Sequence, residues 1–121
     1  MSVLVWAAMG LAGGAGALAR YGLLMLVELR MIGPGPVGIL LVNLSGALVI
    51  GITAGAGLDG DARLIVATGF LGGYTTFSTW MLETQRLTEE RQIWPAIANL
   101  VVSVVLGVAA AMLGQWIAGL L

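Results

Sequence analysis

The chain has no cysteine and no histidine, and charged residues make up only 9% of its 121 positions. Without cysteine there is no disulfide framework and no thiol chemistry, and without histidine there is no imidazole base and no usual zinc or haem ligand. The formal net charge of -1 gives no basic cluster for nucleic acid or for an acidic partner. We therefore expect neither nucleic-acid binding nor enzyme activity.

Apolar residues take the place of the missing charges. Hydrophobic residues make up 60% of the chain, and the mean hydropathy is +1.04. A soluble domain of this length covers its surface with charged side chains, and five basic and six acidic residues are too few for that. Lipid must cover the surface instead, so the sequence predicts an integral membrane protein.

Four apolar stretches recur along the chain, and each reaches the roughly 20 residues that span a bilayer as a helix. They are Val3–Val27, Val37–Leu58, Leu64–Leu82 and Trp94–Leu121. Because the connections are short, helices that are neighbours in sequence should pack as antiparallel neighbours. This predicts an all-α protein with four transmembrane helices in a single domain, residues 1–121.

Ten of the eleven charged residues, all except Arg20, mark the connections between these stretches. Such positions define the ends of membrane helices and do not converge on a catalytic site. Pro95 suits the first turn of the last helix. The first connection holds Glu28, Arg30, Pro34 and Pro36, the second holds Asp59, Asp61 and Arg63, and the third runs from Glu83 to Arg91.

Small residues recur at helical spacing in Gly10/Gly14, Gly51/Gly55 and Ser103/Gly107/Ala111. Such stripes let helices approach closely in lipid, where van der Waals contact holds them together. A four-helix bundle of this length encloses little space, and an ion path needs more lining residues than one chain provides. We therefore expect an oligomer.

Arginine placement hardly distinguishes the two sides of the membrane. With four spans both termini share one side, which carries Arg63, whereas the other side carries Arg30, Arg86 and Arg91. A chain with so weak a bias can insert in both orientations. An antiparallel dimer of identical chains is the hypothesis that follows.

Few polar side chains lie inside the predicted spans, and each must face protein or water there. A serine or threonine can bond to its own helix. Asn43 carries a full amide, which needs partners, so an ion pathway and an interhelical hydrogen bond are both open interpretations.

The third stretch places glycines and β-branched threonines in its middle, between Gly69 and Trp80, and these are poor helix formers. A break there would expose backbone carbonyls that suit a small hard cation such as sodium. A helix kinked for packing is the alternative.

Phe77 and Trp80 lie three residues apart on one helical face, with Glu83 continuing that face. Aromatic edges are electropositive, so they can meet an anion alongside neutral donors, although simple packing explains such a pair as well. The candidate donors are Asn43, Ser78, Thr79 and Ser103.

Three segments of the sequence resemble motifs of the Fluc fluoride channels, also called CrcB. They are the glycine-rich run from Gly13 to Arg20-Tyr21, the segment Asn43–Gly46, and Gly69–Trp80, which is similar to the family's GFxGGxTTFSTF. The resemblance implies a dual-topology dimer in the cell (plasma or inner) membrane. It also implies passive export of cytoplasmic fluoride through two parallel pathways and a central structural sodium ion.

The resemblance assigns roles to individual residues. It implies that the backbone carbonyls of Gly72 and Thr75 bind sodium and that Arg20 and Glu83 serve a gate or vestibule. Trp80 departs from the family, which has phenylalanine there, and Asn99 receives no role. The implied anion pathway consists of Asn43, Phe77, Ser78, Thr79, Trp80 and Ser103.

Two other functions are alternatives for a chain of this length and hydropathy. A small multidrug exporter shares the length and the four spans, but proton-coupled export needs a carboxylate within the membrane, and the first stretch offers Arg20 and no acid. An accessory subunit of a heterodimeric channel, which conducts nothing alone, remains open.

Overall fold

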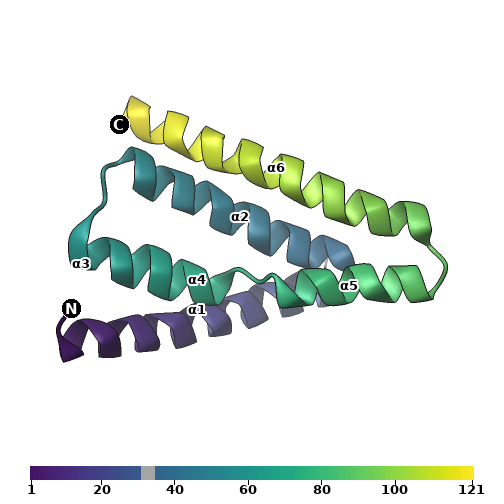
Figure 1. Cartoon of the computed structure of the whole chain (residues 1–121), viewed down its shortest axis with the longest axis horizontal. Coiled ribbons are helices and arrows are strands. Elements are labelled where there is room, and N and C mark those ends of the chain that lie inside the picture. The colour runs from purple at the N-terminus through teal and green to yellow at the C-terminus, as the bar shows by residue number, and fades with distance from the viewer. Residues whose placement is uncertain (31–34) are drawn as a thin grey trace.

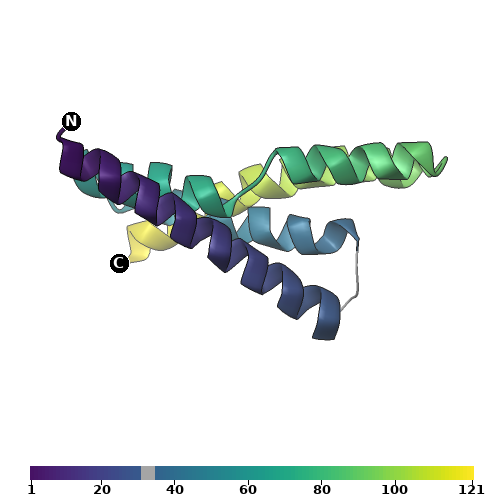
Figure 2. The ribbon, with the colours of Figure 1, turned by 90° about the horizontal axis from the view of Figure 1, so that it is seen from below.

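The computed structural model describes residues 1–30 and 35–121, and across these residues the regular structure is helical, with no strand. The elements run roughly side by side along the long axis of the molecule (Figure 1). Both chain termini lie at the same end of the bundle in the two perpendicular views (Figure 1, Figure 2). This agrees with an even number of crossings.

Three helices in the described part of the chain are long and apolar enough to cross a membrane. They are α1 (Val3–Arg30), α2 (Pro36–Gly55) and α6 (Ile93–Leu120). These correspond to the first, second and fourth predicted stretches. The chain is therefore a multi-pass membrane protein.

The first connection is shorter than we predicted. Glu28 and Arg30 belong to the last turn of α1, and Pro36 is the first residue of α2. Pro34 lies outside the described residues. At the start of α6, Pro95 occupies the first turn as predicted, where it removes no hydrogen bond of the helix interior.

The third stretch is divided into three helical segments, and a short helix that carries Asp61 and Arg63 precedes it, where we predicted only a connection. The short helix α3 (Gly60–Arg63) leads into the π-helical segment η1 (Leu64–Leu71), which is followed by α4 (Gly72–Tyr74) and, after an interruption, by α5 (Ser78–Glu89). Thr75 is extended, with φ -80° and ψ 160°. The helical path therefore stops after Tyr74 and starts again at Ser78.

The acidic and basic residues after Leu82 lie on a helix and not in a connection, which corrects our prediction for this segment. Glu83, Arg86 and Glu89 are all within α5. Glutamate, arginine, glutamine and leucine are good helix formers, and neither glycine nor proline interrupts them. The connection to α6 is therefore limited to residues 90–92.

Helices α2 and α6 form the most extensive contact in the chain. Gly51 faces the backbone of Ala111, Gly55 faces the backbone of Gln115, and Gly114 faces the backbone of Leu48. The predicted close contact along Gly51 and Gly55 is thus confirmed. By contrast, Gly10, Gly14 and Gly107 have open space beside them in the single chain.

Helix α1 packs on η1 and α4 through different glycines from those we expected. A Cβ atom on Gly16 would collide with the carbonyl of Phe70, and one on Gly73 would collide with the carbonyl of Gly13. These contacts bring the backbone of α1 against the segment that precedes the interruption. The position of Arg20, one turn further along α1, depends on them.

Replacing Gly16 with alanine should destabilise the bundle, because the Phe70 carbonyl occupies the space that the new methyl group needs. Overpacking of this kind costs about 1–3 kcal/mol. Thermal unfolding in detergent would measure the loss. Gly22→Ala is the matched control, since nothing lies within 4 Å of a Cβ at that position of the same helix. Equal unfolding temperatures for the two variants would contradict this packing.

Candidate functional site

The interruption between α4 and α5 is held by Asn43 of α2. The Asn43 Nδ2 donates to the carbonyl of Thr76 over 2.9 Å, and the Thr76 amide donates to Asn43 Oδ1 over 2.9 Å. One side chain thus bonds both backbone groups of a residue that has left the helix. Of the two open interpretations of Asn43, the interhelical hydrogen bond is present.

Arg20 of α1 bonds the neighbouring carbonyl. Its Nη1 donates to the carbonyl of Thr75 over 3.1 Å, and the Thr75 hydroxyl donates back to the carbonyl of Leu71 over 2.9 Å. In hydrocarbon an unpaired backbone group costs several kcal/mol, on the order of a lost hydrogen bond in an apolar medium. Side chains from α1 and α2 therefore supply the hydrogen-bond partners that the interrupted helix cannot provide.

The Thr75 amide donates to the Leu71 carbonyl and the Thr76 amide to Asn43 Oδ1, so neither amide bonds the Gly72 carbonyl. It is an available cation ligand. The Thr75 carbonyl is not equally suited, since the Arg20 guanidinium already donates to it and would repel a second cation. These two carbonyls of one chain do not by themselves fit a sodium ion.

A groove of about 400 Å³ opens beside the interruption. Four of the six predicted pathway residues line it. Asn43 comes from α2 and Ser103 from α6, while Phe77 directly precedes α5 and Trp80 lies in its first turn. The rings of Phe77 and Trp80 meet edge to face at 82°, with centroids 5.6 Å apart. The polar and aromatic lining residues are Asn43, Thr75, Thr76, Phe77, Trp80 and Ser103.

Ser78 and Thr79, the other two predicted pathway residues, are not among the residues that line this groove. Their polar groups bond Thr76 at the start of α5. The Thr79 amide donates to the Thr76 hydroxyl oxygen over 3.2 Å, and the Ser78 hydroxyl lies 3.3 Å from the same oxygen. In the single chain they help to begin α5.

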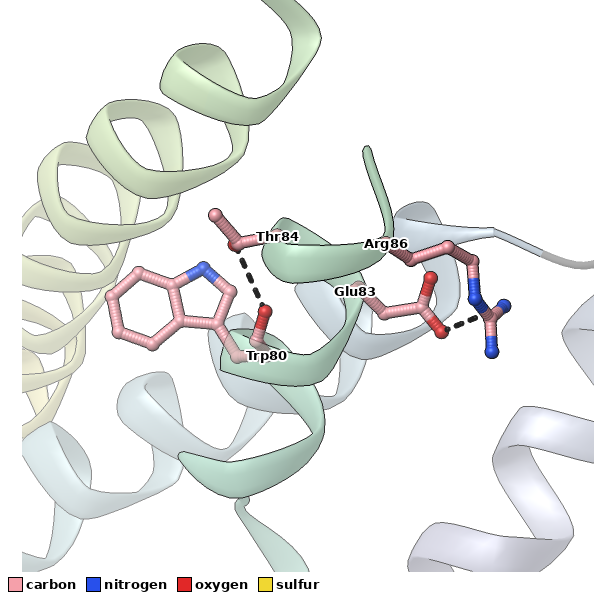
Figure 3. A network of polar contacts seen from close by, with 4 residues as sticks. All are labelled: Trp80, Glu83, Thr84 and Arg86. Atoms are coloured by element: carbon pink, nitrogen blue, oxygen red, sulfur yellow. Dashed lines mark hydrogen bonds and ion pairs between the residues drawn. The ribbon is translucent and has the colours of Figure 1, made fainter. Parts of the chain in front are cut away.

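Glu83 does not meet Arg20. Its carboxylate pairs with Arg86 at 3.6 Å, one turn along α5. Figure 3 shows this ion pair on one side of α5 and the indole of Trp80 on the other. The three-residue spacing from Phe77 to Trp80 to Glu83 drifts around a helix of 3.6 residues per turn, so the face does not continue to Glu83 as we expected.

Several residues of the site were missed in the sequence. The Tyr74 hydroxyl lies 2.8 Å from the Ser45 hydroxyl, and its ring stacks on Phe70 with centroids 6.2 Å apart. Thr84 and Asn99 bond each other across α5 and α6. The four-residue spacing of Trp80 and Thr84 was an available signal, but nothing in the sequence places Asn99 beside them.

The sequence model of a family described as "CrcB-like protein, Camphor Resistance (CrcB)" matches residues 7–115. The chain is 53% identical to "Fluoride-specific ion channel FluC 2" of Mycobacterium tuberculosis over 118 residues, which cover 98% of this chain and 94% of that protein. It is 40% identical to "Fluoride-specific ion channel FluC 1" of Leifsonia xyli over 124 residues, covering 99% and 90%. These relatives carry the name of an ion channel and not of an enzyme.

Replacing Asn43 with aspartate should destabilise the interruption, because a carboxylate cannot donate to the Thr76 carbonyl and repels it. Leaving that carbonyl unpaired costs about 1–3 kcal/mol. Thermal unfolding in detergent would show the loss. Thr53→Val on the same helix is the control, since the Thr53 hydroxyl only bonds its own backbone at Ile50. Unchanged stability of Asn43→Asp would show that the two hydrogen bonds between Asn43 and Thr76 do not hold the interruption.

Proposed function

The chain belongs to the CrcB-like family, and from this premise we propose that it is a subunit of a fluoride-selective channel that lets cytoplasmic fluoride leave passively and so relieves fluoride toxicity. The observation that carries the proposal is the composition of the groove. It brings the Asn43 amide, the Ser103 hydroxyl and the Phe77 and Trp80 rings together, and none of the described residues that line it is ionised.

A neutral lining suits the passage of a small anion. Fluoride must exchange its water for other partners, and a full positive charge in a narrow path would hold it too tightly to leave. Hydroxyl and amide donors and the positive edges of aromatic rings are weaker partners. The Asn43 amide has a second N–H beyond the one that it donates to the Thr76 carbonyl. It can therefore bond Thr76 and contact the anion at the same time.

We further propose an antiparallel dimer in the cell membrane. Large apolar side chains are exposed on every long helix, among them Leu18 at 73% and Met112 at 64%. Gly10, Gly14 and Gly107 leave room for the close approach of another helix. Lipid can cover the apolar side chains as well, so the open glycine positions are the observation that supports a homodimer. The numbered names FluC 1 and FluC 2 among the relatives keep a heterodimer with a paralogue as the alternative.

A structural sodium ion remains a proposal for the dimer only. Hard cations take several oxygen ligands, and one chain offers the free carbonyl of Gly72 beside a Thr75 carbonyl that Arg20 occupies. Gly72 and Thr75 from both chains would supply enough oxygens once Arg20 turned away. A membrane carboxylate of the kind that a multidrug exporter needs does not line the groove among the described residues.

Liposomes that contain only this purified chain should release fluoride rapidly, as read with a fluoride electrode, and should retain chloride. Asn43→Asp should lower that fluoride efflux by about tenfold or more, because a negative charge of the anion's own sign would line the groove. Release from the unaltered chain would exclude the accessory-subunit alternative. A folded, dimeric preparation that released no fluoride would reject the proposal in its homodimeric form.

The sodium proposal has its own measurement. The unfolding temperature of the detergent-solubilised dimer should rise with sodium concentration and should not rise with the same concentration of a large organic cation, because only the bound ion stabilises the folded state. Equal unfolding temperatures in the two salts would contradict a sodium site.

A further inference from the structure

Three hydrogen bonds join Trp80, Thr84 and Asn99, and one of them ties the indole of Trp80 to α6. The indole Nε1–H donates to the backbone carbonyl of Asn99 over 3.0 Å. The Asn99 amide donates to the Thr84 hydroxyl oxygen over 2.9 Å, and that hydroxyl donates to the backbone carbonyl of Trp80 over 3.0 Å. Figure 3 shows the Thr84 bond and the indole directed toward α6.

Thr84 is the centre of this set. It is the one polar residue classed as buried in the described part of the chain, with 9% of its surface exposed. Its single proton goes to Trp80, and its lone pair receives the Asn99 amide. The Asn99 bond crosses the contact of α5 with α6, whereas the bond to the Trp80 carbonyl stays within α5 and orients the Thr84 hydroxyl. Together they fix how α6 lies beside Trp80.

The direction of the indole N–H decides what the groove offers to an anion. Trp80 lines the groove, but its N–H is already bonded to Asn99, so the ring presents carbon-bound hydrogens to that space. A free indole N–H would be a strong donor and would retain a dehydrated anion more tightly than a ring edge does. Phe77 meets the same ring edge to face, which continues the aromatic wall.

We propose that Thr84 and Asn99 are positioning residues that hold the indole N–H against α6, so that Trp80 serves the pathway as an aromatic wall and not as an N–H donor. This rests on the proposed channel function. It explains how tryptophan can stand at this position, since the additional donor of the larger ring is bonded away from the groove. It also gives a role to Asn99.

Fluoride efflux from liposomes, with chloride as reference, would test the positioning role in two backgrounds. Thr84→Val keeps the side-chain volume and removes two of the three bonds. The freed indole N–H would then retain the anion, so fluoride efflux should fall by about tenfold. In Trp80→Phe the same substitution should have no further effect, because phenylalanine has no N–H to position. An equal effect in both backgrounds would overturn the proposal, since Thr84 would then act on the fold alone.

Thr88→Val is the matched control. The Thr88 hydroxyl lies one turn further along α5 and bonds only its own helix, at the Thr84 carbonyl over 2.9 Å. Its removal should leave the efflux within about twofold of the unaltered chain, because a hydroxyl bond to the preceding turn of the same helix adds little.

Hydrogen exchange of the indole N–H tests the same geometry without any transport. The full chain labelled with ¹⁵N-tryptophan gives four indole signals, and the signal lost in Trp80→Phe identifies Trp80. Its exchange should be about tenfold faster in Thr84→Val and unchanged in Thr88→Val. Unchanged exchange in Thr84→Val would overturn the proposal. If the unaltered chain released no fluoride, the proposed function would fail while this measurement still decided the geometry.

Discussion

The need to bond every backbone group at the interruption governs this structure. Once the helix stops at Tyr74, the carbonyls of Thr75 and Thr76 and the Thr76 amide require other partners, because lipid, which the sequence predicts around this segment, offers none. Arg20 and Asn43 supply them from two other helices. The interruption therefore depends on where α1 and α2 lie, and a displacement of either helix would alter the hydrogen bonds just before α5.

Close backbone packing puts those two side chains in place. Glycines at the contact of α1 with η1 and α4 allow the main chains to approach until a single methyl group would collide. Gly46 of α2 leaves room for the side chains of Thr75 and Tyr74. Since no hydrophobic force drives helices together in lipid, such contacts carry the stability. The glycines are thus as necessary to the groove as the polar residues that line it.

The groove combines neutral donors with aromatic rings, and its polar groups are mostly committed to the fold. Asn43 braces the interruption, and the Trp80 indole is bonded to α6. In the pathway that we propose, the partners left for an anion are weak ones, namely a second amide hydrogen, a hydroxyl and ring edges. Weak partners of this kind favour passage over retention. The open stripes at Gly10, Gly14 and Gly107 leave the completion of the path to a second chain, as we propose.

Some features followed from the order of residues alone. The lack of charge and the four apolar stretches predicted a helical membrane protein, and the glycines and threonines between Gly69 and Trp80 marked the segment where α4 ends and α5 begins. Hydropathy and helix propensity are local properties, so a single segment reveals them. The helical continuation from Glu83 to Glu89 was missed because charge masked good helix formers.

Contacts between distant segments could not be deduced in this way. The sequence marked Arg20, Asn43 and Trp80 as polar or unusual, but it did not indicate which carbonyl or helix each would meet, or that Asn99 and Thr84 would share the Trp80 contact. Ser78 and Thr79 are predicted pathway donors, and nothing in the sequence indicated that in the single chain they would bond Thr76. Residue type determined where polar groups had to be satisfied. The hydrogen-bond partners of these groups in distant segments lie 15 to 55 positions away in the chain. Only the packing of the glycine-lined helices brings them together.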